Sequence, residues 1–239
     1  MRLTPRSARR AAVALVAFVL FAGLVALGSW QVQRRAWKLE LIERVDARVH
    51  APPVAAPARE RWPAVDAATD EYRHVQASGV FLRNADTYVQ AVTERGAGFW
   101  LLTPLELADG SVVIVNRGFV PPELRTRITA VTGPVNVTGL LRLTEPGGGF
   151  LRRNEPTANR WYSRDVQAIA TARGLARVAP YFIDAGAGVP DANAPVGGLT
   201  VIAFSNNHLV YAITWYTLAL MVAAGGWRLM REEHRGGHD

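Results

Sequence analysis

The sequence has no cysteine and one lysine, Lys38. Without cysteine the chain cannot form disulfides, zinc–thiolate sites or covalent c-type haem attachments, and it lacks the thiolates that favour copper(I) delivery. It also lacks a Gly-x-Ser-x-Gly motif and a glycine-rich phosphate loop between a strand and a helix. Its carboxylates are scattered, so spacing designates no acid–base pair. These absences disfavour an enzyme and a copper chaperone.

The positive charge comes almost wholly from arginine. The chain has 27 Lys and Arg against 20 Asp and Glu, a net charge of +7. A basic balance is typical of proteins that meet nucleic acid or an anionic membrane surface. Here the arginines gather at the ends of apolar runs, and no basic stripe interleaved with aromatic residues crosses the middle of the chain. The pattern therefore predicts a lipid membrane as partner and no nucleic acid.

Two uncharged apolar runs, residues 11–30 and 209–227, are each long enough for a hydrocarbon core of roughly 30 Å. Four arginines precede the first run and three follow the second, whereas residues 179–208 contain no Lys or Arg. The positive-inside rule then predicts cytoplasmic termini and an exported middle. The first run exceeds the apolar core of a signal peptide, about 7–15 residues, so we expect an uncleaved anchor.

Helical spacing continues beyond the first run. Trp30 and Trp37 lie seven residues apart, on one helical face. This face is either the membrane helix continuing into water or a docking surface for a partner. The proline-rich residues 50–58 then end the helix, because proline lacks an amide donor.

From Tyr72 the pattern changes to strands, with the segments YRHVQASGVFL, TYVQAVTE, FWLLTPLEL, SVVIVNRGFV, PVNVTGLLRL and, later, PYFIDAG. The Asp-Gly of LADGS predicts a hairpin turn. We expect residues 144–160 to form a loop, Ser163 to cap a short helix ending at Gly174, and residues 185–198 to be a flexible tether. The fold class is a membrane protein with two transmembrane α-helices flanking an exported β-rich α+β domain. The expected divisions are 1–10 (cytoplasmic tail), 11–30 (first span), 31–50 (helical extension), 51–207 (periplasmic domain with linkers), 208–227 (second span) and 228–239 (cytoplasmic tail).

The most distinctive exported stretch is VNRGFVPPE, residues 115–123. Gly118 would permit a bulge or a backbone turn, and Arg117 is a candidate for a carboxylate contact. The alternative is a strand end held by a salt bridge and a proline pair.

His208 stands at the mouth of the second span. Tyr211, Ala212 and Trp215 follow at three, four and seven residues and are expected to share its face. Imidazole is a usual axial ligand of haem iron, although a histidine at this depth can also cap the helix or meet a lipid headgroup. Small residues would leave room on this face and let the first span approach closely: Ala212, Ala219, Ala22 and Ala26.

Taken in order, several segments resemble the Surfeit locus protein 1 family: LGSWQVQRRAWKLELIERVDAR, YRHVQASGVF, GFWLLTPLEL, VIVNRGFVPP, VTGLLR, NEPTANRWYSRDVQAIA and NNHLVYAITWYTLAL. The resemblance implies a non-enzymatic assembly factor for cytochrome c oxidase. The implied location is the bacterial inner membrane, where bacterial members are thought to bind haem a (heme a) and help place it in the catalytic subunit. Implied partners are that subunit and haem a synthesis or other assembly factors.

The resemblance points to His208 and Trp215 for haem, with Tyr211 beside them and His208 as the iron ligand. Residues of its motifs expected to bind a partner or support the fold are Trp30, Gln31, Arg34, Trp37, Asn116, Arg117 and Gly118. Two other hypotheses stay open. One is a haem-free scaffold that holds an oxidase subunit, and the other is a membrane-tethered enzyme.

Overall fold

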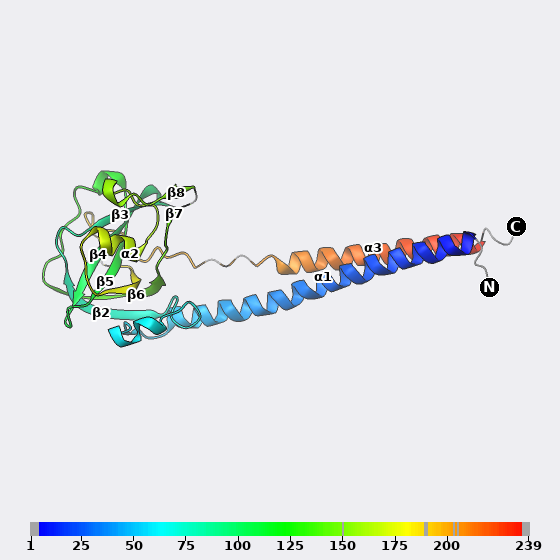
Figure 1. Ribbon diagram of the computed structural model, residues 1–239, viewed down its shortest axis with the longest axis horizontal. Helices are drawn as coiled ribbons and strands as arrows, with labels where there is room; N and C mark the ends of the chain where they lie inside the picture. Colours follow the sequence, from blue (N-terminus) through cyan, green and yellow to red (C-terminus); the bar gives the residue numbers. More distant parts are fainter. Residues whose placement is uncertain (1–4, 150, 189–190, 203, 205, 236–239) are drawn as a thin grey trace. The chain divides into compact units, whose positions relative to one another are not determined.

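The computed structural model describes residues 5–149, 151–188, 191–202, 204 and 206–235. The chain divides into two compact units, Met1–Glu43 with Ala203–Asp239, and Arg44–Ile202. The first unit holds two long helices, and the second is a β-rich domain (Figure 1). The expected fold class is confirmed.

The two long helices are α1 (Pro5–His50) and α3 (His208–Arg235). Residues 6–51 contain no proline, and α1 ends just before Pro52 and Pro53, which cannot continue a helix. The most apolar windows of the two helices have mean hydropathies of 2.6 and 1.5, so both are long and apolar enough to cross a membrane.

The helices pack against each other in antiparallel directions (Figure 1). A Cβ on Gly28 would touch the ring of Tyr216, and one on Gly226 would lie 3.5 Å from the Cβ of Ala17. The less exposed residues recur at alternating spacings of three and four, which is typical of helices packed along their length. In α1 they include Ala17, Phe21, Leu24, Gly28, Gln31, Arg35 and Lys38, and in α3 His208, Ala212, Trp215, Ala219, Val222 and Gly226.

The domain is a closed five-stranded barrel, with β2, β6, β9, β5 and β4 paired in that order and β4 pairing back to β2. All pairs are antiparallel except β5 with β9, which is parallel. β3 extends the sheet beyond β4, and β1 lies parallel to the start of β2. The strands are β1 (Val54–Ala55), β2 (His74–Phe81), β3 (Thr87–Thr93), β4 (Gly96–Leu107), β5 (Val112–Val120), β6 (Pro134–Leu143), β7 (Gly148–Gly149), β8 (Arg152–Arg153) and β9 (Val178–Ala185).

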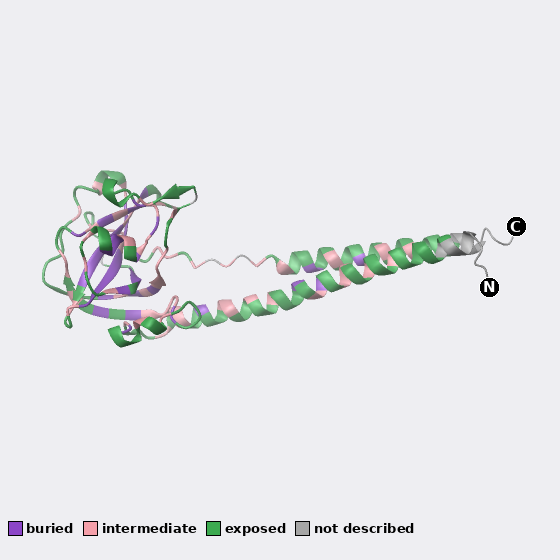
Figure 2. Cartoon of the chain, viewed as in Figure 1, coloured by how far each residue is buried: buried purple, intermediate pink, exposed green. Residues whose placement is uncertain are grey.

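Alternation along the strands creates two apolar layers. In the domain the buried residues gather on the strands of the sheet (Figure 2). Val113 and Val115 of β5 pack inside the barrel with Tyr181 of β9. Ile114 and Phe182, on the opposite face, pack against the short helix α2 (Val166–Ala172). Because side chains alternate between the two faces of a strand, Asn116 and Asp184 belong to the second face.

Most local expectations for the domain are confirmed, and two are wrong. The Asp-Gly hairpin joins β4 to β5, with Gly110 at φ +71°. The cap of α2 is Asp165, whose side chain accepts from the amide of Ala168, and not Ser163. Ser163 instead accepts from Asn154. The second wrong expectation is the loop at residues 144–160, which contains the β7–β8 hairpin and the 3-10 helix η3 (Pro156–Ala158). Two other 3-10 helices, η1 (Arg59–Ala64) and η2 (Pro122–Leu124), lie elsewhere in the domain.

Candidate functional site

His208 is the first residue of α3 and is half-buried. Its Nδ1 lies 2.7 Å from Oε1 of Gln31 on α1, a residue that is only 9% exposed. The other ring nitrogen, Nε2, makes no hydrogen bond to the described residues. The sequence placed His208 and Gln31 among the candidates separately, and the structure joins them across 177 positions.

Trp215 follows His208 on the face that packs toward α1, where Ala212 and Ala219 are each 2% exposed. Its indole Nε1–H is buried without a hydrogen-bond partner among the described residues, as is Oδ1 of Asn206. A buried donor without an acceptor costs about 1–3 kcal/mol. Trp215 on α3, and Asn206 just before that helix, therefore each carry a buried polar atom that the described residues leave unpaired.

Gly28 sets the separation of the two helices beside this site. A Cβ there would lie 2.8 Å from the Tyr216 ring, whose hydroxyl is 3.1 Å from that of Ser29. The small residues expected to allow the approach, Ala22 and Ala26, are exposed instead. Ala212 and Ala219 are buried by the helix pairing.

The remaining candidates of the helix pair point outward. Tyr211 is 54% exposed and lies at the edge of the His208 face. Trp30 and Trp37 are 54% and 43% exposed. The Arg34 guanidinium stacks 4.0 Å from the centroid of Trp37. An outward aromatic and cationic surface of this kind is typical of a membrane interface or of a partner contact.

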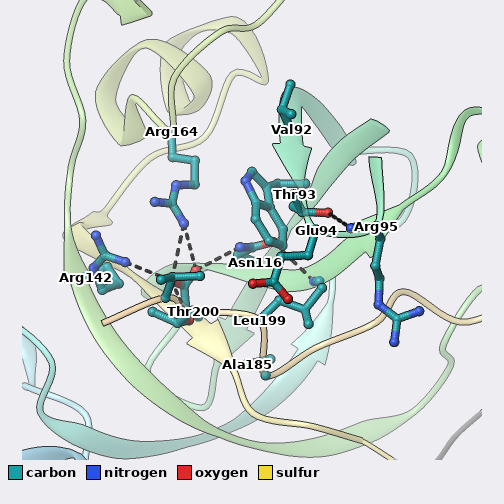
Figure 3. A pocket seen from close by; sticks show the side chains of 15 residues that line it. Val92, Thr93, Glu94, Arg95, Asn116, Arg142, Arg164, Ala185, Leu199 and Thr200 are labelled. Carbon is teal, nitrogen blue, oxygen red and sulfur yellow. Dashed lines mark hydrogen bonds and ion pairs between the residues drawn. The ribbon is translucent and has the colours of Figure 1, made fainter. Parts of the chain in front are cut away.

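The domain contains a cavity of about 570 Å³ on its α2 face. Arg142, Arg164 and Asn116 point toward one another across it (Figure 3). They meet at Asp184, which is 4% exposed and which sequence reasoning missed. Its carboxylate accepts from Asn116 at 2.8 Å, Arg142 at 3.2 Å, Arg164 at 3.1 Å and Thr200 at 3.0 Å. In the sequence, the feature that could have predicted this network is the carboxylate of Asp184 near the end of the apolar strand PYFIDAG.

Two more carboxylates complete the network. Arg142 donates through Nε to Glu71 at 3.0 Å, and Arg164 donates to both oxygens of Glu145. Burial alone would raise the pKa of Glu145, but the hydrogen bonds and charge of Arg164 hold that pKa below its usual value. Both guanidinium groups are committed to carboxylates, so they hold the domain together and offer no uncompensated charge to an incoming anion.

Gly118 forms the predicted bulge in β5. The β4–β5 register slips between Leu101 and Leu102, leaving Arg117 as the extra residue, and Gly118 adopts φ +130°. The bulge is confirmed, but Arg117 makes no ion pair within the described residues. Its guanidinium instead stacks 5.3 Å from the Phe81 centroid, and burial lowers its pKa.

In the part of the chain that the structure describes, no three His, Asp or Glu side chains lie close enough together to hold a metal ion. His50 and His74 bind main-chain carbonyls, those of Asp46 and Ala51. His50 also lies 3.3 Å from the carboxylate of Asp46, one turn earlier on the same helix. Among these three histidines, His208 is the one whose side-chain partner comes from another helix.

Comparison with known proteins decides the family. A model described as the SURF1 family matches residues 18–220, which include the domain and part of each long helix. The chain belongs to the SURF1 family. Surfeit locus protein 1 of Homo sapiens is 37% identical over 215 residues, covering 81% of this chain and 69% of the relative. The protein of that name in Rattus norvegicus is 37% identical over 226 residues (84% and 71%), and a SURF1-like protein of Monosiga brevicollis is 36% identical over 224 (87% and 83%).

SURF1 family members are assembly factors for cytochrome c oxidase and are not enzymes. The membership confirms the resemblance seen in the ordered motifs and the expectation that the chain is not an enzyme. The roles of the individual site residues and the binding of haem a stay predictions.

Proposed function

We propose that this protein is an inner-membrane assembly factor that binds haem a on the α1–α3 helix pair and assists its insertion into the catalytic subunit of cytochrome c oxidase. The observation that carries the proposal is the state of His208. Its Nδ1 is held by Gln31, while Nε2 makes no hydrogen bond to the described residues. An imidazole nitrogen with a free lone pair is a usual axial donor to haem iron.

The other groups on the helices fit a porphyrin cargo. The Nε1–H of Trp215 is buried and has no acceptor among the described residues, and it would be a donor for an oxygen substituent of the ring where haem binding exposes it. The helix surface around it is apolar, as an apolar cargo requires. The remaining histidine of α3, His234, is 26 residues further along, roughly 39 Å by helical rise. One iron ligand from α3 suits a protein that must release its cargo.

The proposed topology places both termini in the cytoplasm of a bacterium and the domain in the periplasm, because the arginines flank the outer ends of the two apolar runs. Reporter fusions at Ala56, Gly148 and the C-terminus test it. Periplasmic activity at the first two positions with cytoplasmic activity at the third is expected. A cytoplasmic signal from Gly148 contradicts the topology and a role at the outer face.

The test of haem binding is the visible spectrum of the full chain purified from cells that synthesise haem a. The wild-type protein should carry haem, His208→Ala should lose or shift the spectrum, and Trp215→Leu should retain less haem. His50→Ala and Trp227→Leu are matched controls, since both residues are exposed and lie outside the site. Haem content and spectra unchanged in both site variants would favour the haem-free scaffold instead.

A further inference from the structure

Gln31 is buried at the point where α1 meets the first turn of α3. It is 9% exposed, and Oε1 approaches Nδ1 of His208 at 2.7 Å. The neighbouring glutamine of α1, Gln33, is exposed. The burial and the short contact distinguish Gln31 from a solvated polar residue.

The contact determines which ring nitrogen carries the proton. A neutral imidazole has one N–H and one lone pair, and an amide oxygen only accepts a hydrogen bond. Nδ1 therefore donates to Oε1 of Gln31, and the lone pair lies on Nε2. Hydrogen bonds of this kind fix the tautomer and the ring orientation of histidines that bind metals. Water competes less at a partly buried contact than on an open surface, so the preference is stronger than it would be for an exposed pair.

We propose that Gln31 is a positioning residue: it holds His208 in the Nδ1–H tautomer and presents Nε2 as the nitrogen that binds haem iron. The inference rests on the proposed function. Because Gln31 belongs to α1 and His208 to α3, the ligand is oriented only while the two helices are paired. Haem binding is then coupled to helix pairing by this hydrogen bond. Loss of such a partner weakens metal binding about 10–100-fold.

The first measurement needs no haem. The full chain, labelled with ¹⁵N in histidine and held in lipid nanodiscs, reports the protonation of each His208 ring nitrogen by NMR. The wild-type ring should be protonated at Nδ1. Gln31→Met removes the acceptor at similar side-chain length and should abolish this preference. Gln31→Glu keeps an acceptor oxygen and should restore it, and Gln33→Met is the control on the same helix.

The second measurement is a titration of the same variants with haem a, followed by the Soret band. Gln31→Met should raise the Kd about 10–100-fold and shift the band, whereas Gln31→Glu and Gln33→Met should stay close to wild type. Gln31→Met must retain the helix pairing, checked by a disulfide between Ala17→Cys and Gly226→Cys, so that a loss of fold is distinguished from a loss of positioning.

The outcomes separate the two ideas. If wild type binds no haem a, or if His208→Ala binds it unchanged, the proposed function fails and the inference fails with it. If binding depends on His208 but Gln31→Met has the wild-type Kd and band position, the inference alone is overturned. A wild-type ring protonated at Nε2 also overturns it, because the glutamine amide would then be donating to Nδ1.

Discussion

At the scale of single residues, one buried carboxylate organises the charges of the domain. Asp184 is held by four donors that come from β5, β6, the segment before α2 and the tether after β9. Burying a charge is costly unless it is paired and hydrogen-bonded. Removal of one partner therefore matters more than the net energy of the pairs suggests.

Asp184→Asn should lower the free energy of unfolding of the domain by about 3 kcal/mol, because it removes the buried charge that Arg142 and Arg164 share and leaves only Glu71 and Glu145 to pair with them. The measurement is urea unfolding of the detergent-solubilised chain, followed by tryptophan fluorescence. Glu106→Gln, an exposed carboxylate on β4, is the control and should change little. Equal stabilities of the two variants would contradict this account of the network.

Glu145 should make the stability of the domain depend on acid pH. Its pKa is held below the usual 4.5 in the folded state, despite burial, by hydrogen bonds and charge from Arg164. The folded state therefore binds this proton less readily, so the stabilisation is complete above about pH 4.5 and is lost as pH falls through the folded pKa. Unfolding measured from pH 6 to pH 3 should show a shallower acid decline in Glu145→Gln. An unchanged slope would mean that other carboxylates dominate.

At the scale of elements, the tether after β9 is partly built into the domain. Val196 exchanges two main-chain hydrogen bonds of 2.9 Å with Phe119 of β5. Gly198 donates to the carbonyl of Ala185, and Thr200 donates to Asp184. The β5 bulge allows this docking, because Gly118 has no side chain where the carbonyl of Val196 passes.

Gly118→Ala should displace this segment and destabilise the domain by about 2–3 kcal/mol. A Cβ there would lie 2.3 Å from the Val196 carbonyl oxygen, and φ is already +130°. Gly133→Ala is the matched control: φ is +84° but the space around it is open, so strain alone should cost about 1 kcal/mol. Faster amide hydrogen exchange at Val196 and Phe119 should accompany the first change and not the second.

At the scale of the whole molecule, each of the two units is stabilised differently. The domain closes its own barrel and buries its apolar residues inside it and under α2. The two long helices leave most of their apolar surface exposed, with 6% and 11% of their most apolar windows buried. Lipid or a partner must cover that surface, which agrees with a membrane assembly factor.

The pairing of α1 and α3 can be tested in the intact chain. Cysteines at Ala17 and Gly226 would have Cβ atoms about 3.5 Å apart, close enough for a disulfide. The natural chain has no cysteine, so no other disulfide competes. Oxidation in membranes should cross-link the double variant within one chain, as a mobility shift that reduction reverses.

Adding Gly28→Val to the cysteine pair should lower the yield of cross-link, because the new side chain meets the Tyr216 ring. Gly23→Val, where the space is open, should leave the yield unchanged. A similar yield with both valines would mean that the helices pair in another way.

The sequence by itself determined the two apolar helices, the strands, the Asp-Gly turn, the bulge at Gly118 and, through its ordered motifs, the family. These features depend on local causes: side-chain periodicity, the backbone freedom of glycine and the absence of proline from residues 6–51. The prediction of Ser163 as the cap was wrong because several nearby polar residues suit a helix start, and the path of the chain selects one of them, Asp165.

Only the tertiary structure decided which distant groups meet. Gln31 and His208 are 177 positions apart, Asn116 and Asp184 are 68 apart, and no local pattern encodes either hydrogen bond. The tertiary structure also decided that Gly28, and not Ala22 or Ala26, lies at the helix contact. Small residues are common in such helices, and the packing register selects among them. Burial then gives these contacts their strength, since a polar group removed from water must find its partner within the fold.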